Sequence, residues 1–305
     1  MHIVLPGALP DPGAATELAS RLAQTAPTLA RWFERARAEI LPSHAADTRC
    51  TPLEHWLLEA RGFQAAQTQH LSAGLGPLRA SGRLTDDEPV WLAELIHMAP
   101  SRDGAALLTA DRLDITDAQA QALFESARTA FEDAGITADY DTPQQWRVRW
   151  PGAGALPCAS PALVAASSVN DWWPQEDAAR PWRRLVNTLQ MLWHEHPVNQ
   201  ARAHTGQAPV NSLWLYGGAR ASQLSRPLPD DTRIHDALYA AALAQDWGNW
   251  LAALETLETK VFAPRAGQRP TLVLTGRKRI VILTARTGWL ARLNKENWRS
   301  WWSNP

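Results

Sequence analysis

The chain has 305 residues, of which 45% are hydrophobic and 20% charged, with a formal net charge of −1 at pH 7 and a pI near 6.8. These values are typical of a globular chain, and they exclude both a highly charged disordered chain and a long apolar run that spans a bilayer. The balanced charge gives no overall field that attracts DNA or anionic lipid, so a polyanion site would have to be local. We expect no association with a membrane.

The cysteines and the first residues indicate a cytoplasmic protein. Cys50 and Cys158 are far apart and form no CxxC pair, which argues against a disulfide framework and a structural zinc site. The stretch from Met1 to Pro10 has no basic region followed by a long apolar segment, so we expect no signal peptide.

Tryptophan is unusually abundant, with 16 residues against three Tyr and five Phe. Two explanations stay open. Tryptophan can take the place of other aromatic residues in core and half-buried positions, or it can line a ligand cleft or partner surface.

The first half of the chain alternates apolar runs with capping signals and glycines. These patterns predict a strand at His2–Leu5 ending at Pro6-Gly7, a helix from Ala14, a helix from Pro27 with Leu29, Trp32, Phe33 and Ala36 on one face, a helix from Thr51 with a capping box to Glu54, a loop between halves at Ser81–Pro89, paired strands at Val90–Met98 and Gly104–Thr109, and a helix at Asp117–Ala134 capped by Thr116 and stopped by Gly135.

The second half continues the alternation. Its patterns predict strands at Ile136–Tyr140 and Trp146–Trp150 around Pro143, a loop at Pro151–Pro161, a helix at Asp177–His196 ending before Pro197, a strand at Ser212–Tyr216 leading into Gly217-Gly218, a helix from Trp247 to Val261, and a hairpin of Thr271–Thr275 with Ile280–Thr284 around Gly276. This order favours an α/β sheet flanked by helices. We expect one unit over 1–305, with a small inserted α+β subdomain at 90–220.

The segment 187–220 concentrates polar and glycine residues around one helix end and one strand, and it is the candidate site. His194-Glu195-His196 suggests a metal site, but its two histidines are two residues apart, whereas the HExxH pattern places them one helical turn apart. Alternatively, one histidine caps the helix C-terminus and the other packs internally.

The remaining candidates in this segment suggest anion binding. Asn199, Arg202 and Asn211 can bind an anion together with the backbone amides of Gly217 and Gly218, beside Arg220. The alternative is that the same side chains only fix the path of the loop. The glycine pair lacks the spacing of a phosphate-binding loop and the Lys-Ser/Thr that follows one. The candidate ligand-binding residues are His196, Asn199, Arg202, Asn211, Gly217, Gly218 and Arg220.

Several stretches resemble a bacterial family known as RpfE-type regulatory proteins. They are HPVNQARAHTG from His196, PVNSLWLYGGA from Pro209, the Met1–Leu5 strand with Pro6-Gly7, PTLARWFERA from Pro27, IHMAPSRDGAALL from Ile96 and QQWRVRW from Gln144. The resemblance covers most of the chain. It implies a regulatory role without specifying a reaction.

The HPVN to Gly-Gly segment also resembles, more distantly, the archaeal-type cofactor-independent phosphoglycerate mutases. That resemblance implies an alkaline-phosphatase-like α/β core, two divalent metals and a phosphorylated serine intermediate. The chain departs from this pattern. Pro6 stands where the mutases have the metal-binding Asp of an Asp-Gly pair, and Tyr216 stands where they have an Arg.

The late metal ligands of the mutases have no counterpart either. Two ions about 4 Å apart need clustered carboxylates and imidazoles, yet the last His is His235 and the last Asp is Asp246. No serine lies in a recognisable nucleophile elbow. These departures favour a phosphomutase-like scaffold that has lost its metal chemistry, so we expect no metal or other cofactor.

The region 260–305 is basic and carries Trp289, Trp298, Trp301 and Trp302. Basic residues among aromatics can bind single-stranded nucleic acid, or they can form a solvated edge whose arginine stems cover tryptophan. Nucleic acid is not the expected partner.

The sequence thus favours a non-catalytic, regulatory phosphomutase-like protein that binds a small phosphorylated or anionic ligand or a protein partner. The alternatives are a phosphoglycerate mutase-type enzyme and, third, a nucleic-acid-binding protein.

Overall fold

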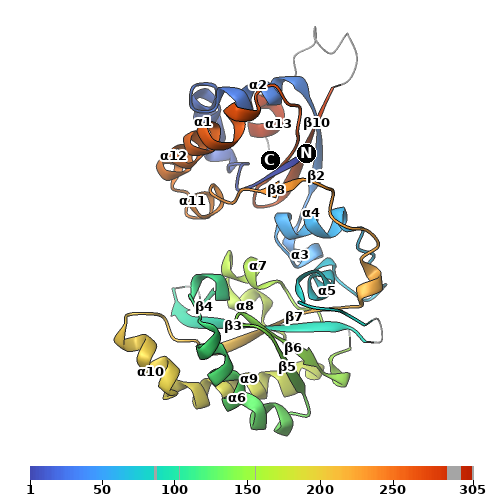
Figure 1. The fold of residues 1–305 in the computed structure, drawn as a ribbon, viewed down its shortest axis with the longest axis vertical. Helices are drawn as coiled ribbons and strands as arrows, with labels where there is room; N and C mark the ends of the chain where they lie inside the picture. The colour runs from blue at the N-terminus through green and yellow to red at the C-terminus, as the bar shows by residue number, and fades with distance from the viewer. Residues whose placement is uncertain (86–87, 103, 155, 287–296, 304–305) are drawn as a thin grey trace. The chain divides into compact units, whose positions relative to one another are not determined.

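The computed structural model describes residues 1–85, 88–102, 104–154, 156–286 and 297–303. These residues form two compact units, where the sequence analysis expected one. Unit 1 comprises Met1–His44 and Leu228–Pro305, and unit 2 comprises Ala45–Pro227. The blue and red ends of the chain in Figure 1 together build unit 1. The predicted boundary loop at Ser81–Pro89 lies inside unit 2, as does the expected subdomain at 90–220.

Unit 1 contains a five-stranded sheet in the order β2-β10-β9-β1-β8. Its elements are β1 (His2–Pro6), α1 (Pro12–Thr25), α2 (Pro27–Arg35), β2 (Ala36–Pro42), β8 (Thr232–Ile234), α11 (Tyr239–Leu243), α12 (Trp247–Leu257), β9 (Thr271–Thr275), β10 (Arg279–Ala285) and α13 (Arg299–Ser303). β1 runs parallel to β8 and β9, whereas β10 is antiparallel to β9 and β2. One core joins this sheet to α1, α2, α12 and α13.

Unit 2 contains a second five-stranded sheet, in which β3 pairs with β4, β6 and β7, and β6 pairs with β5. Its elements are α3 (Ala45–Thr48), α4 (Pro52–Ala60), α5 (Leu75–Arg79), β3 (Val90–Ser101), β4 (Gly104–Leu108), α6 (Asp117–Asp133), β5 (Thr137–Thr142), β6 (Gln145–Arg149), α7 (Pro161–Ala165), α8 (Val169–Trp172), α9 (Arg180–His194), α10 (Pro197–His204) and β7 (Ser212–Ala219).

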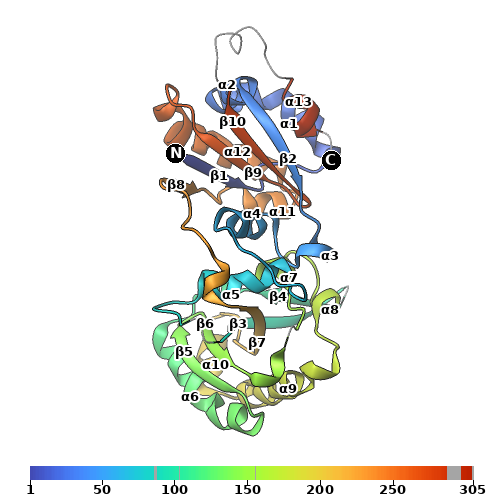
Figure 2. The same ribbon diagram turned by 90° about the vertical axis from the view of Figure 1, so that its right-hand side faces the viewer.

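Side chains of this sheet alternate between two cores. Leu213 and Leu215 of β7 pack with α6 and α9, whereas Trp214 and Tyr216 pack with α4, α5 and α7. Figure 2 shows α6, α9 and α10 together along one side of the sheet. The prediction of an α/β protein whose sheet is flanked by helices is therefore confirmed.

Two local predictions need correction, and α10 was not predicted. Ala36 begins β2, because it pairs with Ala285 of β10, and does not continue the helix from Pro27. The helix predicted to end before Pro197 does so, at His194, and Pro197 begins a further helix, α10, since a proline is tolerated at a first helical position. The strand at Ser212 continues through Gly217 and Gly218 to Ala219.

None of the helices in the described part of the chain combines the length and the apolarity that crossing a membrane requires.

Candidate functional site

The carboxyl ends of β1, β8 and β9 are the first place to look for a site in unit 1. These strands are parallel, so their ends lie at one edge of the sheet, where open α/β sheets bind ligands. The residues that follow them are Gly7 after β1, Gly276 after β9 and His235-Asp236 after β8. Pro6 is the last residue of β1, at the position where the resemblance to the mutases implies a metal-binding Asp.

The segment after β1 is buried, and its backbone groups form hydrogen bonds with side chains and with the end of β9. The indole N–H of Trp250 donates to the carbonyl oxygen of Gly7 at 2.9 Å, and the indole N–H of Trp302 donates to that of Ala8 at 3.2 Å. The amide of Leu9 donates to the carbonyl of Thr275 at 3.2 Å, which ties the segment to the end of β9. Two of the 16 tryptophans thus close this edge from α12 and α13.

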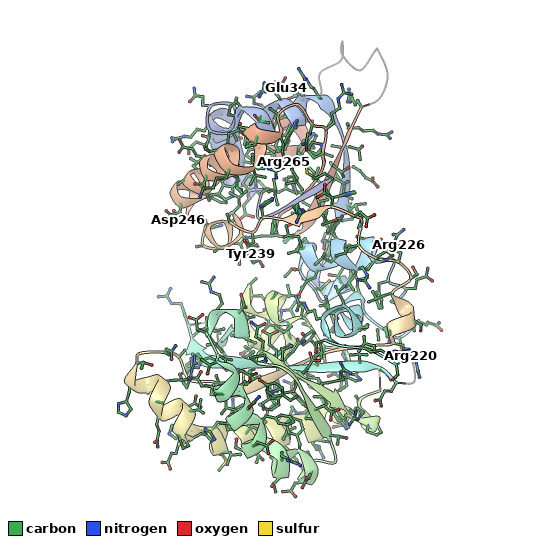
Figure 3. The ribbon with its side chains drawn as sticks, in the orientation of Figure 1. Glu34, Arg220, Arg226, Tyr239, Asp246 and Arg265 are labelled. Carbon is green, nitrogen blue, oxygen red and sulfur yellow. The ribbon has the colours of Figure 1, made fainter. Side chains whose placement is uncertain are left out.

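Gly7 packs directly against α11. Its φ of 76° favours glycine, and a Cβ at this position would lie 2.9 Å from Cα of Tyr239 and 3.0 Å from the carbonyl oxygen of Leu238. Figure 3 labels Tyr239 at the start of α11. Protein atoms therefore fill the space beside the end of β1.

The first carboxylate after β1 is already paired. Asp11 Oδ2 lies 3.2 Å from Nε of Arg277 and accepts a 3.1 Å hydrogen bond from Gln245. Arg277 also donates to the carbonyl of Leu243 in α11. At the end of β8, burial, with Arg265 nearby, lowers the pKa of His235. Among the described residues, no group of three or more His, Cys, Asp or Glu is arranged to hold a metal ion.

The segment 187–220 lies in unit 2, and its polar side chains mostly bind the backbone. His196 is the N-cap of α10, where its Nδ1 accepts from the amide of Val198 at 3.2 Å, and burial lowers its pKa. Asn199 is buried. Its amide group donates to the carbonyls of Trp193 and Val210 and accepts from the amide of Val210, each at 2.8 Å.

Arg202 is 1% exposed, and its guanidinium holds three separate parts of unit 2 together. It donates to the carbonyls of Ala208 and Leu113 and to the side-chain oxygen of Gln119. These partners satisfy each of its nitrogens, which is the condition for burying a charged side chain.

The side-chain amide of Asn211 forms the same kind of hydrogen bonds to β3 as a backbone peptide group of a paired strand. It accepts from the amide of Met98 and donates to the carbonyl of Met98, both at 2.8 Å. The backbone amide of Asn211 also donates to the carbonyl of Ile96.

The glycine pair is a point of close packing within the sheet. A Cβ on Gly217 would lie 2.6 Å from the carbonyl oxygen of Val90 and 2.8 Å from Cα of Gly76. A Cβ on Gly218 would lie 2.5 Å from the ring of Trp91. Both residues have positive φ, at 96° and 107°. The glycines thus allow β7 to contact its neighbours.

Arg220 is exposed beyond the far end of β7, and its amide donates to the side-chain oxygen of Gln223 at 2.8 Å. Asn211 precedes the same strand. The eight residues of β7, at about 3.3 Å each, separate the two residues by on the order of 25 Å. The structure brings His196, Asn199, Arg202 and Asn211 into one region and places Arg220 elsewhere.

The sequence analysis missed a buried polar cluster in unit 2. Glu54 forms an ion pair with Arg79 at 2.7 Å and accepts hydrogen bonds from Thr51 and Ser160. The guanidinium of Arg79 lies over the ring of Tyr216, 5.6 Å from its centroid. The position that carries an arginine in the resembled mutases therefore carries an aromatic residue that contacts an arginine from α5.

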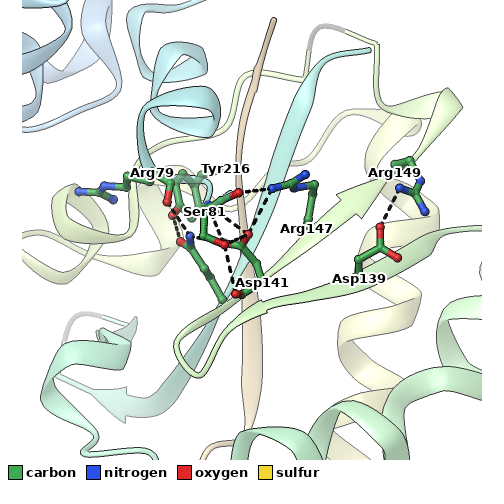
Figure 4. Close-up of polar contacts among 8 residues, drawn as sticks. Arg79, Ser81, Asp139, Asp141, Arg147, Arg149 and Tyr216 are labelled. Carbon is green, nitrogen blue, oxygen red and sulfur yellow. Dashed lines mark hydrogen bonds and ion pairs between the residues drawn. The ribbon is translucent and has the colours of Figure 1, made fainter. Parts of the chain in front are cut away.

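A second polar cluster adjoins Arg79 in Figure 4. Asp141 accepts from the hydroxyl of Ser81 at 2.6 Å and pairs with Arg147 at 3.3 Å, and Asp139 pairs with Arg149 at 2.7 Å. The sequence contains a signal for these pairs. Acidic residues alternate in β5 and arginines alternate in β6, and the two strands form a hairpin.

The tryptophans of the basic C-terminal region are largely committed to the core. Trp298, Trp301 and Trp302 are at most 5% exposed, and two of them pack edge-on against Phe33. Trp289 lies outside the described residues. The three described rings therefore offer no exposed face on which a nucleic-acid base can stack.

No family model matches this chain, so its membership of the RpfE-type family stays a prediction. The chain is similar to a probable 2,3-bisphosphoglycerate-independent phosphoglycerate mutase from Geobacter sulfurreducens, with 23% identity over 159 residues. The match covers 50% of this chain and 39% of that protein. The chain thus spans well under two thirds of the relative's length.

Two solved structures are also similar. One is a cofactor-independent phosphoglycerate mutase from Thermoplasma acidophilum, with a TM-score of 0.37, 16% identity, and coverage of 98% of this chain and 93% of that chain. The other is the PH0037 protein from Pyrococcus horikoshii, with a TM-score of 0.48, 13% identity, and coverage of 98% and 91%. On the sequence match, this chain is distantly similar to the cofactor-independent phosphoglycerate mutases.

Proposed function

We propose that this chain is a phosphomutase-like protein that performs no phosphoryl transfer and acts as a regulatory protein by binding a small anionic ligand. The observation that carries the proposal is the packing of Gly7 against Tyr239 at the carboxyl end of β1. A ligand or metal ion at this edge would have to displace α11 or the segment after β1.

The hydrogen bonds of this segment support the proposal. Trp250 and Trp302 occupy the carbonyl oxygens of Gly7 and Ala8, so these oxygens are already satisfied. Asp11 is the first carboxylate after β1, and it is bound to Arg277. Pro6 offers neither a carboxylate nor an amide N–H.

The similarity to a probable phosphoglycerate mutase supports an anionic ligand. A scaffold that no longer performs the chemistry can keep the ability to bind a phosphorylated molecule. Binding of that ligand would then be the signal that a protein partner recognises.

The test combines metal analysis with an assay of phosphoglycerate turnover. Purified protein should contain far less than one Mn or Zn ion per chain, and it should not interconvert 3- and 2-phosphoglycerate with added Mn²⁺. A cofactor-independent phosphoglycerate mutase serves as the positive control for the assay. Stoichiometric metal together with turnover that scales with protein concentration would overturn the proposal.

A further inference from the structure

Unit 1 contains a cavity of about 560 Å³ at the edge of its sheet opposite to the carboxyl ends of β1 and β9. This volume lies within the range of small-molecule sites, roughly 300–1,000 Å³. Residues at the end of α2, before β9 and at the end of β10 form its walls. Its charged residues are Arg31, Glu34, Arg35, Arg269 and Arg286. Four arginines and one glutamate give these walls a formal charge of +4 − 1 = +3.

Two of these arginines stand opposite each other. Ala36 of β2 pairs with Ala285 of β10, and the amide of Arg286 donates to the carbonyl of Arg35 at 3.4 Å, which extends the pairing by one residue. This backbone bond brings the C-terminal end of α2 beside the end of β10, and residues from both elements line the cavity.

The arginines of the cavity differ in their internal bonds. Arg31 donates to the carbonyl of Pro27 and to the hydroxyl of Thr28. The side chains of Arg35 and Arg269 are exposed, and neither has a hydrogen-bond or ion-pair partner within the described ranges. Their guanidinium groups are therefore available to a ligand. Arginine suits phosphate in particular, because its planar group can donate two parallel hydrogen bonds.

Trp32 adds a second, independent observation. It lines the same cavity and is 8% exposed, and its indole N–H has no hydrogen-bond partner in the part of the chain that the structure describes. A buried donor without a partner costs free energy, and a ligand oxygen would satisfy it. Pro270, Leu272 and Leu283 supply an apolar wall beside it.

We infer that this cavity binds a phosphorylated small molecule with a short apolar part. The phosphate pairs with Arg35 and Arg269, and the apolar part contacts the wall formed by Trp32, Pro270 and Leu272. The inference rests on the proposed function for the identity of the ligand as an anion, and it assigns that ligand a site in unit 1 that is separate from the edge closed by Tyr239.

Isothermal titration calorimetry of the full chain tests the inference with three matched probes: phenyl phosphate, inorganic phosphate and phenol. Phenyl phosphate should bind more tightly than inorganic phosphate, since it also contacts the apolar wall, and phenol should not bind measurably. Raising the NaCl concentration from 50 to 500 mM should weaken the binding of both phosphates, because salt screens exposed charges.

Three variants locate the site. Arg35→Gln and Arg269→Gln should each weaken phenyl phosphate binding about tenfold, since each removes charge-assisted hydrogen bonds. Arg37→Gln is the matched control. It removes the same charge from an exposed position two residues from Arg35 that does not line the cavity, and it should change the affinity less than twofold. These side chains are exposed, so the variants should keep the wild-type thermal midpoint.

The outcomes separate this inference from the proposed function. Unchanged affinity in the Arg35→Gln, Arg269→Gln double variant would overturn the assigned site and leave the proposed function standing. Failure of the wild-type protein to bind either phosphate would also overturn the inference. Turnover of phosphoglycerate that persists in the double variant would overturn the proposed function and show that its chemistry takes place outside this cavity.

Discussion

Trp250 donates its indole hydrogen bond to the carbonyl oxygen of Gly7, 243 residues away in the sequence. The acceptor lies directly after β1, and the donor lies on α12. Both groups are buried, so neither can exchange this partner for water. The bond makes the segment after β1 part of the core of unit 1.

Replacing Trp250 tests this assignment. Trp250→Phe keeps an aromatic ring but leaves the Gly7 carbonyl without its donor, and it should lower the free energy of unfolding by about 1–3 kcal/mol in urea titrations. Trp247→Phe, on the same helix, is the control, because Trp247 is less buried and no tryptophan-to-Gly7 bond is lost. Equal effects of the two substitutions would show that the hydrogen bond contributes little.

Asn199 should matter for stability, because its side chain makes three buried hydrogen bonds to the backbone. Asn199→Ala should destabilise the protein by about 2–4 kcal/mol, since it leaves buried backbone groups of Trp193 and Val210 unpaired. The exposed Asn187→Ala on α9 should change stability by less than about 0.5 kcal/mol. If Asn199→Ala were equally mild, its amide would be free to bind a ligand, as the sequence analysis suggested.

Gly217 distinguishes a packed strand from an anion cradle. Gly217→Ala should destabilise the protein by about 3 kcal/mol or more, because the new Cβ meets the backbone of Val90 and Gly76 at a positive φ. Gly13→Ala in α1 should instead stabilise it by about 0.5–1 kcal/mol, since no atom lies within 4 Å of the new methyl group. Thermal unfolding of the two variants measures both shifts. A mild effect at Gly217 would indicate open space beside β7.

Glu94 should make stability depend on pH. Burial raises its pKa from 4.5 to about 7, although Arg79 and the amide of Ala110 act in the opposite direction. Between these two values the folded protein holds a proton that the unfolded chain releases, so stability should fall as the pH rises from about 4.5 to about 7.

Glu94→Gln removes this dependence while keeping an acceptor for the amide of Ala110. At pH 8 the variant should be more stable than wild type by up to about 3 kcal/mol, and at pH 4.5 the two should be nearly equal. Urea unfolding at several pH values gives the comparison, with the exposed Glu125→Gln as the control. Parallel pH profiles for Glu94→Gln and wild type would contradict the assignment.

Local signals in the sequence predicted much of the secondary structure. The capping box predicted at Thr51 forms with Glu54, and the predicted N-cap Thr116 forms a capping box with Gln119, because such motifs depend only on residues three apart. The hairpin around Gly276 also forms as predicted. By contrast, β2 was missed, because the helical pattern continues through Ala36 and only pairing with β10 makes that segment a strand.

The candidate site shows why polar residues are harder to interpret. Arg202 binds the carbonyl of Leu113, 89 residues earlier. Because every residue has a backbone carbonyl, the sequence does not indicate which one an arginine binds. A glycine looks the same in the sequence whether it binds an anion or allows a strand to touch a helix, as Gly217 of β7 and Gly76 of α5 do. The arginines of the cavity could not be grouped from the sequence, since Arg35 and Arg269 become neighbours only through the pairing of strands from both ends of the chain.

The discontinuous composition of unit 1 has a consequence for biosynthesis. β1 is translated before unit 2, yet its strand partners within the described part of the chain begin at Thr232 and Thr271. β1 therefore has no strand partner until the ribosome has made the whole of unit 2, and its apolar side chains stay outside a sheet until then. Unit 2 can assemble from a continuous segment during this time. The order of synthesis thus differs from the order of completion, because β1 is made before unit 2 but its sheet can form only after unit 2 has been made.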